Sequence, residues 1–176
     1  ASFGRTDDQL DRFLRDGIWE IDEPSERHRE QVRSMEPSQK IAVKATYTKK
    51  QGLPFDNSGR VVSVMAIKAT GTITGNSGSG ERVEVDWDAP FEPREWYHYT
   101  YQPTVWEVYP NKEMARRLIA FAFEGVPQDH AEAVRWYRLA ATIGAGYITS
   151  SWYLGSLLPH RRPAGLRAGT YVVQPR

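Results

Sequence analysis

Eight aromatic side chains fall within 23 residues of this 176-residue chain, and aromatic rings can bind flat ligands by stacking. On a strand, Tyr97, Tyr99 and Tyr101 would lie on one face, with Trp96 and His98 on the other. One face must join the core, so the other would show its rings to solvent or to a ligand. A nucleobase gains roughly 1–3 kcal/mol per aromatic partner, and carbohydrate rings stack on the same surfaces. The eight residues are Trp87, Phe91, Trp96, Tyr97, Tyr99, Tyr101, Trp106 and Tyr109.

Positive charge gathers next to this aromatic segment, although the whole chain has a net charge of only +1. Residues 40–70 contain six basic side chains against Asp56 alone, while residues 1–39 and 71–111 are both acidic on balance. A basic segment in a nearly neutral protein can bind phosphate groups. A solvated lysine face on a strand and loop is an equally good interpretation of these counts.

Trp19 is placed by an amphipathic helix predicted over 6–17. Leu10, Phe13 and Leu14 share one face of that helix, and Gly17 suits the left-handed position that ends it. The indole that follows is either part of the core or one wall of a pocket for a flat ligand. For a lone tryptophan the core is the more frequent use.

No arrangement of residues predicts catalysis, a metal site or a cofactor. His28, His98, His130 and His160 lie far apart and show no metal-ligand spacing. No serine lies in a Gly-x-Ser-x-Gly motif, and the glycine-rich segment 75–80 lacks the lysine of a phosphate-binding loop. We therefore expect a protein that is not an enzyme.

Composition and periodicity predict one α+β core. Hydrophobic residues make up 40% of the chain, cysteine is absent, and no apolar run is long enough to cross a membrane. These features favour a cytoplasmic protein that does not enter a membrane. Helices over 6–17 and 112–123 flank predicted strands over 40–47, 61–74, 82–87, 95–101 and 104–108. The expected architecture is a small five- to six-stranded β-barrel flanked by helices, with a C-terminal helical hairpin.

A series of motifs in a fixed order carries a family resemblance over about residues 1–128. Together they resemble the EVE-like domain at the front of McrB-type AAA+ restriction proteins, which belongs with the EVE, YTH and other PUA-related barrels. The motifs are Ser2-Phe3-Gly4, Thr6-Asp7-Asp8-Gln9, Gly17-Ile18-Trp19-Glu20, Lys40-Ile41-Ala42-Val43-Lys44, Gly52-Leu53-Pro54-Phe55-Asp56-Asn57, Val64-Met65-Ala66-Ile67-Lys68, Val85-Asp86-Trp87 and Pro93-Arg94-Glu95-Trp96-Tyr97.

The resemblance implies a DNA-binding module that reads a modified base. In that family the base is flipped into an aromatic cage, at a cost of a few kcal/mol that stacking can recover. By position, Trp19 matches the cage tryptophan and Glu20 its neighbour, while Ser2, Phe3 and Gly4 line the pocket floor and Trp87 is structural. Phe55, Trp96 and Tyr99 are candidates for the second wall, with Asp56 beside Phe55. Lys44, Lys49, Lys50 and Arg60 would hold phosphates.

The implied ligand is methylated or hydroxymethylated cytosine, or N6-methyladenine, and the implied setting is a modification-dependent restriction system with an AAA+ motor or nuclease subunit as partner. Family members carry an apolar strand before the Ser-Phe-Gly turn. Either that strand lies upstream of the given sequence, which we prefer, or Thr170-Tyr171-Val172-Val173 takes its place.

The C-terminal third has a weaker pattern of its own. Residues 131–141, with Gly144 and Leu154-Gly155, resemble one Sel1-type helical repeat, and a helical hairpin packed on the barrel is the preferred alternative. The expected organisation is therefore a modified-base-binding domain over 1–128, a helical hairpin over 129–158 and a tail over 159–176. The alternative from another functional class is a protein-interaction scaffold in which the aromatic rings belong only to the core.

Overall fold

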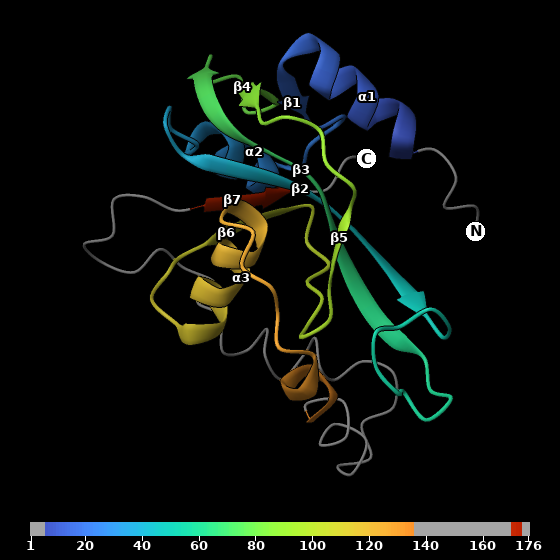
Figure 1. Ribbon diagram of the computed structural model, residues 1–176. Helices are drawn as coiled ribbons and strands as arrows, with labels where there is room; N and C mark the ends of the chain where they lie inside the picture. The colour runs from blue at the N-terminus through green and yellow to red at the C-terminus, as the bar shows by residue number, and fades with distance from the viewer. Residues whose placement is uncertain (1–5, 136–169, 174–176) are drawn as a thin grey trace.

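A mixed sheet of seven strands forms the centre of the protein, with helices packed around it (Figure 1). The structure is a computed structural model, and it describes residues 6–135 and 170–173. The strands are β1 (Ile18–Glu20), β2 (Lys40–Lys49), β3 (Val62–Asn76), β4 (Arg82–Trp87), β5 (Arg94–Trp96), β6 (Val105–Val108) and β7 (Thr170–Val173). The helices are α1 (Thr6–Asp16), α2 (Glu26–Arg33) and α3 (Glu113–Phe123), and residues 130–135 are also helical.

The strand order is β1-β4-β3-β2-β7-β6, with β5 paired to β3. The edge strands β1 and β6 do not pair with each other in the part of the chain that the structure describes. The α+β class is therefore confirmed, while closure into a barrel stays a prediction. None of the helices in the described ranges is long and apolar enough to cross a membrane.

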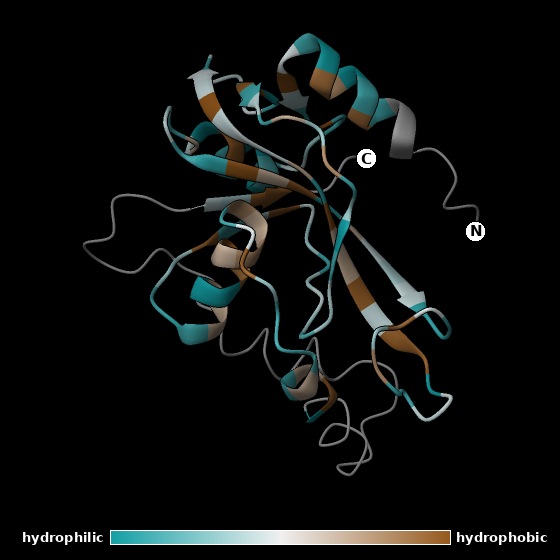
Figure 2. Cartoon of the chain, in the orientation of Figure 1, coloured by the Kyte–Doolittle hydropathy of each residue, from teal (hydrophilic) through white to brown (hydrophobic). Residues whose placement is uncertain are grey.

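Hydrophobic residues recur along the strands of the sheet (Figure 2), and their side chains form two buried cores. On β2, Ile41 and Val43 join one core and Ala42 joins the other, as the alternation of a strand requires. We call the first the Trp19 core. It also contains side chains from α1, α2, β3, β4, β6 and β7 and from the residues that follow β1 and α2, namely Phe13, Ile21, Val32, Met35, Ala69, Ile73, Val83, Val85, Val105, Tyr171 and Val173. The second, the Trp96 core, consists of Ala42, Met65, Ile67, Trp96, Tyr99, Trp106, Val108, Ala115, Leu118, Phe121, Ala122 and Val172.

A β-bulge explains how β3 serves both cores. The register between β2 and β3 shifts between Val43 and Lys44, because Val43 pairs with Ala69 while Lys44 pairs with Ile67. Lys68 is the extra residue, and a bulge moves the side chains beyond it to the other face. Ala69 thus lies in the Trp19 core and Ile67 in the Trp96 core.

The strand β7 overturns the prediction of a tail over 159–176. Residues Thr170–Val173 pair in parallel with β2 and antiparallel with β6, so they form an interior strand of the sheet. This segment supplies side chains to both cores through Tyr171, Val172 and Val173. The preference for a first strand upstream of Ser2 stays a prediction. Residues 159–169 and 174–176 lie outside the described residues.

The segment after β5 and the predicted C-terminal hairpin differ in how they compare with the structure. The predicted strand over 95–101 is wrong beyond Trp96, because only Arg94–Trp96 pairs with β3 and the chain then leaves the sheet. The helical hairpin predicted over 129–158 is described only at its start, where residues 130–135 are helical. The remainder, including most of the Sel1-like segment, lies outside the described residues.

Candidate nucleic-acid interface

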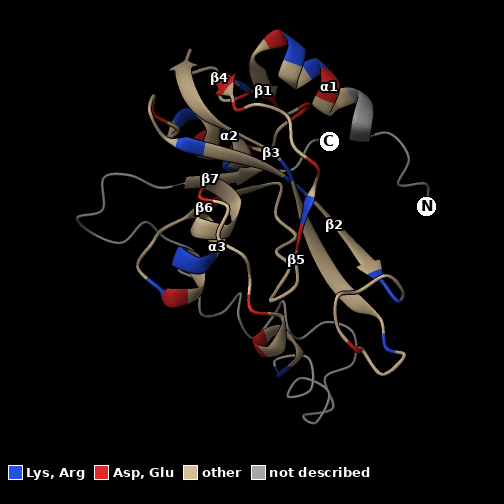
Figure 3. Cartoon of the chain, viewed as in Figure 1, with Lys and Arg blue, Asp and Glu red and all other residues tan. Residues whose placement is uncertain are grey.

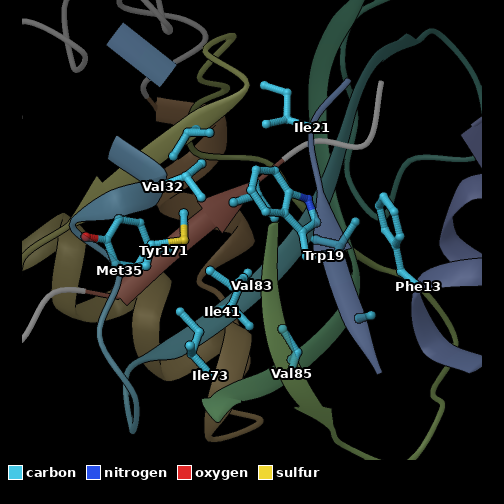
Figure 4. Close-up of a cluster of buried hydrophobic side chains, with 14 residues drawn as sticks. Phe13, Trp19, Ile21, Val32, Met35, Ile41, Ile73, Val83, Val85 and Tyr171 are labelled. Carbon is cyan, nitrogen blue, oxygen red and sulfur yellow. The ribbon is translucent and has the colours of Figure 1, made fainter. Parts of the chain in front are cut away.

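Trp19 lies at the centre of the Trp19 core, with no exposed surface (Figure 4). Figure 4 shows the indole within this cluster, whose labelled members include Phe13, Ile21 and Val83. The neighbouring helix is fixed by Gly17, which ends α1 at a φ of 65°, and by the Trp87 indole, which donates to the Phe13 carbonyl at 2.9 Å. Among the described residues, the Trp19 Nε1–H has no hydrogen-bond acceptor. These are the surroundings of a core residue.

The structure does not bring Trp19 together with the rings predicted to face it. Trp96 and Tyr99 belong to the Trp96 core, on the other face of the sheet from the Trp19 core. Rings on opposite faces of one sheet cannot stack on the same base. Glu20 is half-buried and forms an ion pair with Arg12 at 2.6 Å. Ser2, Phe3 and Gly4 lie outside the described residues.

Lys44 is not a phosphate-binding residue, contrary to the prediction. Its side chain has no exposed surface, and its Nζ donates to the Tyr101 carbonyl at 2.7 Å. Burial lowers the pKa of Lys44 to about 8. The alternation of β2 was interpreted as having one solvated face, but the Trp96 core and the chain after β5 cover that face.

Lys49 is also engaged within the protein. Its Nζ lies 2.8 Å from both carboxylate oxygens of Glu95, which also accepts hydrogen bonds from the hydroxyl groups of Tyr47 and Tyr97. Burial alone would raise the pKa of Glu95, but the bonds from Lys49, Tyr47 and Tyr97 outweigh it and lower the pKa. Lys49 therefore neutralises Glu95 and adds little free positive charge to the surface.

Lys50 and Arg60 remain as exposed cations, and one side chain holds their backbones together (Figure 3). The Asn57 amide donates to the Lys50 carbonyl at 2.9 Å and also to the Arg60 carbonyl. Asp56, which is exposed, accepts a bond from the Ser58 backbone N–H at 2.8 Å and so shapes the turn. Lys50 and Arg60 form no ion pair with the described residues. The β2–β3 loop thus presents two cations from an ordered turn.

Phe55 connects this loop to the aromatic segment that follows β5. Its ring meets the ring of Tyr97 edge to face, with centroids 5.2 Å apart, and lies 6.2 Å from the ring of His130. Edge-to-face contacts of this kind stabilise by roughly 0.5–1.5 kcal/mol beyond burial. The predicted pocket residue Phe55 is therefore half-buried in an aromatic junction between the loop and residues 97 and 130.

A pocket of about 380 Å³ lies beside this junction. Trp96 and His98 line it from the chain at and after β5, with ring centroids 4.7 Å apart. Arg116, Arg117 and Ala120 line it from α3, and residues 126–129 close another side. Tyr99 is buried behind this wall, where its ring meets that of Trp96 edge to face at 5.8 Å.

Three groups fix the walls of this pocket. The Gln128 amide accepts from the Tyr97 backbone N–H at 2.8 Å and donates to the Glu95 carbonyl, so it pairs with the free edge of β5. Arg94 donates to the Ala122 carbonyl at 2.6 Å and thereby caps the C-terminal end of α3. Asp129 accepts from the backbone of Ala131 and Glu132 and starts the helical turn over 130–135.

The pocket is lined by both apolar and charged side chains, and the charges largely cancel. Glu113 bridges Arg116 at 2.7 Å and Arg117 at 2.9 Å, and Arg117 also contacts Glu132. Burial lowers the pKa of His98, and the charges of Arg117 and His130 add to this effect while Glu132 and Asp129 oppose it. Burial therefore favours the neutral form of the imidazole. Among the described residues, His98 Nδ1 and Trp96 Nε1 are buried and have no hydrogen-bond partner.

Sequence reasoning missed most of this pocket. Trp96 was a candidate, and His98 was placed on the same face of the predicted strand but was not named as a pocket residue, while no residue of α3 was assigned to a site. The available signal was the spacing of Glu113 with Arg116 and Arg117, which places all three on one exposed side of the helix. In the described ranges, no cluster of three or more His, Asp or Glu side chains could hold a metal ion.

Comparisons with protein-family models, with curated proteins and with solved structures found no match to this chain.

Proposed function

We propose that this chain is a DNA-binding module that recognises a modified base, with the PUA/EVE/YTH-like barrel as its fold. The base would be methylated or hydroxymethylated cytosine, or N6-methyladenine, flipped out of the duplex into an aromatic site. The module would act in the cytoplasm, without catalysis of its own, as the specificity part of a modification-dependent restriction system. An AAA+ motor or a nuclease subunit would be its partner.

The β2–β3 loop is the observation that carries this proposal. It holds two exposed cations, Lys50 and Arg60, on either side of the Asn57 amide, and the ring of Phe55 lies in the same loop. Cations bind backbone phosphates without regard to sequence, while aromatic groups interact with bases. Figure 1 shows this loop at the end of the β2–β3 hairpin that is far from α1, so a long ligand can approach it.

The ordered sequence of motifs gives further support. The helix before Trp19, the β2–β3 hairpin and the strand β4 were predicted from hydrophobic periodicity and are present, and the motifs lie on or beside these elements. The base-stacking role of Trp19 needs an opening of the Trp19 core, since its ring has no exposed surface. The phosphate-binding part of the proposal now rests on Lys50 and Arg60, because Lys44 is buried and Lys49 is paired.

The test compares two double variants that remove the same charge. Lys50→Gln with Arg60→Gln removes the loop cations, and Arg15→Gln with Arg82→Gln removes two exposed cations from α1 and β4. Each phosphate contact contributes about 0.9 to the slope of log K against log salt, so the loop variant should lose about 1.8 from that slope. The control should keep the slope of the wild type. Equal slopes for both variants would contradict phosphate binding by this loop.

A further inference from the structure

The geometry points to the pocket between α3 and the Trp96–His98 segment as the place that receives the flipped base, in preference to Trp19. This inference rests on the proposed function and names the ligand subsite within it. Its volume of about 380 Å³ falls in the range of small-molecule sites, whereas the Trp19 ring is enclosed by the side chains of its own core.

The lining of the pocket suits the ring and the polar edge of a base. Ala120, Val126 and Pro127 supply apolar surface. The side chains of Trp96 and His98 also line it, and each is 1% exposed and has a buried polar atom without a partner among the described residues. Such groups destabilise a folded protein unless a ligand or water bonds them. Both atoms are closed to solvent in this structure, so the side chains of Trp96 and His98 must turn their polar atoms toward the pocket before the edge of a base, which offers acceptors and donors, can bond them.

The two free atoms have complementary abilities. The Trp96 Nε1–H is a donor only, so it requires an acceptor such as a ring nitrogen or carbonyl of a base. In the neutral form that burial favours, the Nδ1 of His98 can donate or accept according to the tautomer. A base whose edge carries an acceptor beside a second polar group can form hydrogen bonds with both Trp96 Nε1 and His98 Nδ1. A purely apolar ligand would leave both unsatisfied.

Arg116 gives the rim of the pocket a group for the phosphate of the same nucleotide. Its side chain is 54% exposed, and its Nη2 lies 2.7 Å from Glu113. A phosphate can replace that exposed carboxylate as the partner of Arg116, because exposed ion pairs contribute little stability. Arg117 is held by both Glu113 and Glu132, and we assign it to the wall of the pocket.

The chain segment that lines the pocket also contacts the proposed phosphate-binding loop. Tyr97 lies between Trp96 and His98 in sequence, and its ring contacts Phe55 of the β2–β3 loop. Gln128, which lines the pocket, bonds to the backbone of the same segment. A strand bound by Lys50 and Arg60 would therefore pass the aromatic junction before it reaches the pocket.

The experiment blocks the pocket from its exposed side. Val126 lines the pocket and is 48% exposed, so Val126→Trp fills the opening without disturbing either core. Ala89→Trp, on the exposed connection after β4, is the matched control. Binding is measured by fluorescence anisotropy with duplexes that carry plain cytosine, 5-methylcytosine, 5-hydroxymethylcytosine or N6-methyladenine.

We expect the wild type and Ala89→Trp to prefer one modified duplex by about fourfold, the gain from burying one methyl-sized group. Val126→Trp should lose that preference and keep the salt dependence of the wild type. Trp19→Phe should keep both. The inference would be overturned if folded Val126→Trp kept the preference for the modified duplex. It would also be overturned if Trp19→Phe lost that preference while Val126→Trp kept it. Both results would leave the proposed function intact. If the wild type binds every duplex without preference, modified-base reading itself fails.

A direct measurement supplements the binding series. The ¹⁵N signals of the His98 imidazole should shift on addition of the preferred modified nucleoside monophosphate to the wild type. They should not shift in Val126→Trp. Unchanged His98 signals in a wild-type protein that binds modified duplexes would place the base elsewhere.

Discussion

Replacing Lys44 by methionine should stabilise the protein near neutral pH and remove a rise in stability at alkaline pH. The Lys44 ammonium has no exposed surface, and it donates a hydrogen bond to the Tyr101 carbonyl at 2.7 Å. Burial lowers its pKa from 10.5 to about 8, so the charged form is less favourable in the folded state than in the unfolded state.

The magnitude and sign follow from proton linkage. Between pH 8 and pH 10.5 the unfolded chain binds a proton that the folded protein does not, so the stability of the wild type rises with pH in this window. At about 1.4 kcal/mol per tenfold change in proton affinity, the rise amounts to about 3 kcal/mol. Below pH 8 the full penalty is present, and above pH 10.5 it is absent. Loss of a hydrogen bond from a charged group costs about 1.5–3 kcal/mol, so Lys44→Met should gain about 1 kcal/mol at pH 7.

The assay is urea denaturation of both proteins at pH 7, 8.5 and 10, with the difference in unfolding free energy as the readout. Tyr47 and Tyr99, whose pKa values are raised by burial, are present in both proteins and cancel in the difference. The difference should change sign as the pH rises. A difference that is constant with pH would refute the reasoning, and so would a loss of DNA binding in Lys44→Met as large as in the variant of Lys50 and Arg60.

The remaining predictions concern the fold. A chain ending at residue 169 lacks the interior strand β7 and should show no cooperative unfolding transition by circular dichroism; a native-like transition would mean that the sheet closes without β7. Gly71→Ala should lower the unfolding free energy by about 1–3 kcal/mol, because an added Cβ would lie 2.6 Å from the Asp86 carbonyl oxygen, and an unchanged urea midpoint would show that the strands can separate there. Trp19→Ala should cost about 3–5 kcal/mol in the same measurement, as expected for a fully buried ring, and a loss under 1 kcal/mol would indicate that Trp19 lies in an open pocket.

Elements with a local pattern could be predicted from the sequence. The strand over 82–87 was predicted at its observed limits, because Val83 and Val85 alternate with exposed polar residues. The helix over 112–123 differs from α3 by one residue, since apolar residues recur at helical spacing. Such patterns can be recognised in the sequence because each of these elements packs only one face against one core.

The features that the sequence did not predict depend on packing between segments that lie far apart in the chain. Lys44 alternates with apolar residues as a solvated side chain would, but its face is covered by residues some 57 positions later. The tyrosines after Trp96 alternate as they would on a strand with one exposed face. Residues 97, 99 and 100 are nevertheless all buried, because the chain leaves the sheet after Trp96 and packs against the cores. The position of β7 depends on pairing with β2, which lies more than 120 residues earlier in the chain.

In the candidate site too, residues close in sequence could be grouped in advance, while residues brought together by folding could not. Lys50, Arg60 and Phe55 share one loop, so sequence proximity was enough to group them. The pocket needs Trp96, α3 and residues 126–129, which come together only through the pairing of Gln128 with β5 and of Arg94 with the end of α3. Trp19 was grouped with Trp96 and Tyr99 by resemblance and residue type, and the sheet separates them.

The central claim is that this chain distinguishes a modified base in DNA. The most direct test is the dissociation constant of the wild-type protein for otherwise identical duplexes that differ only at one base, measured at one fixed salt concentration. The account predicts tighter binding to one of the duplexes with 5-methylcytosine, 5-hydroxymethylcytosine or N6-methyladenine than to the plain duplex, by about fourfold. Equal dissociation constants for all duplexes, or no binding to any of them, would contradict it.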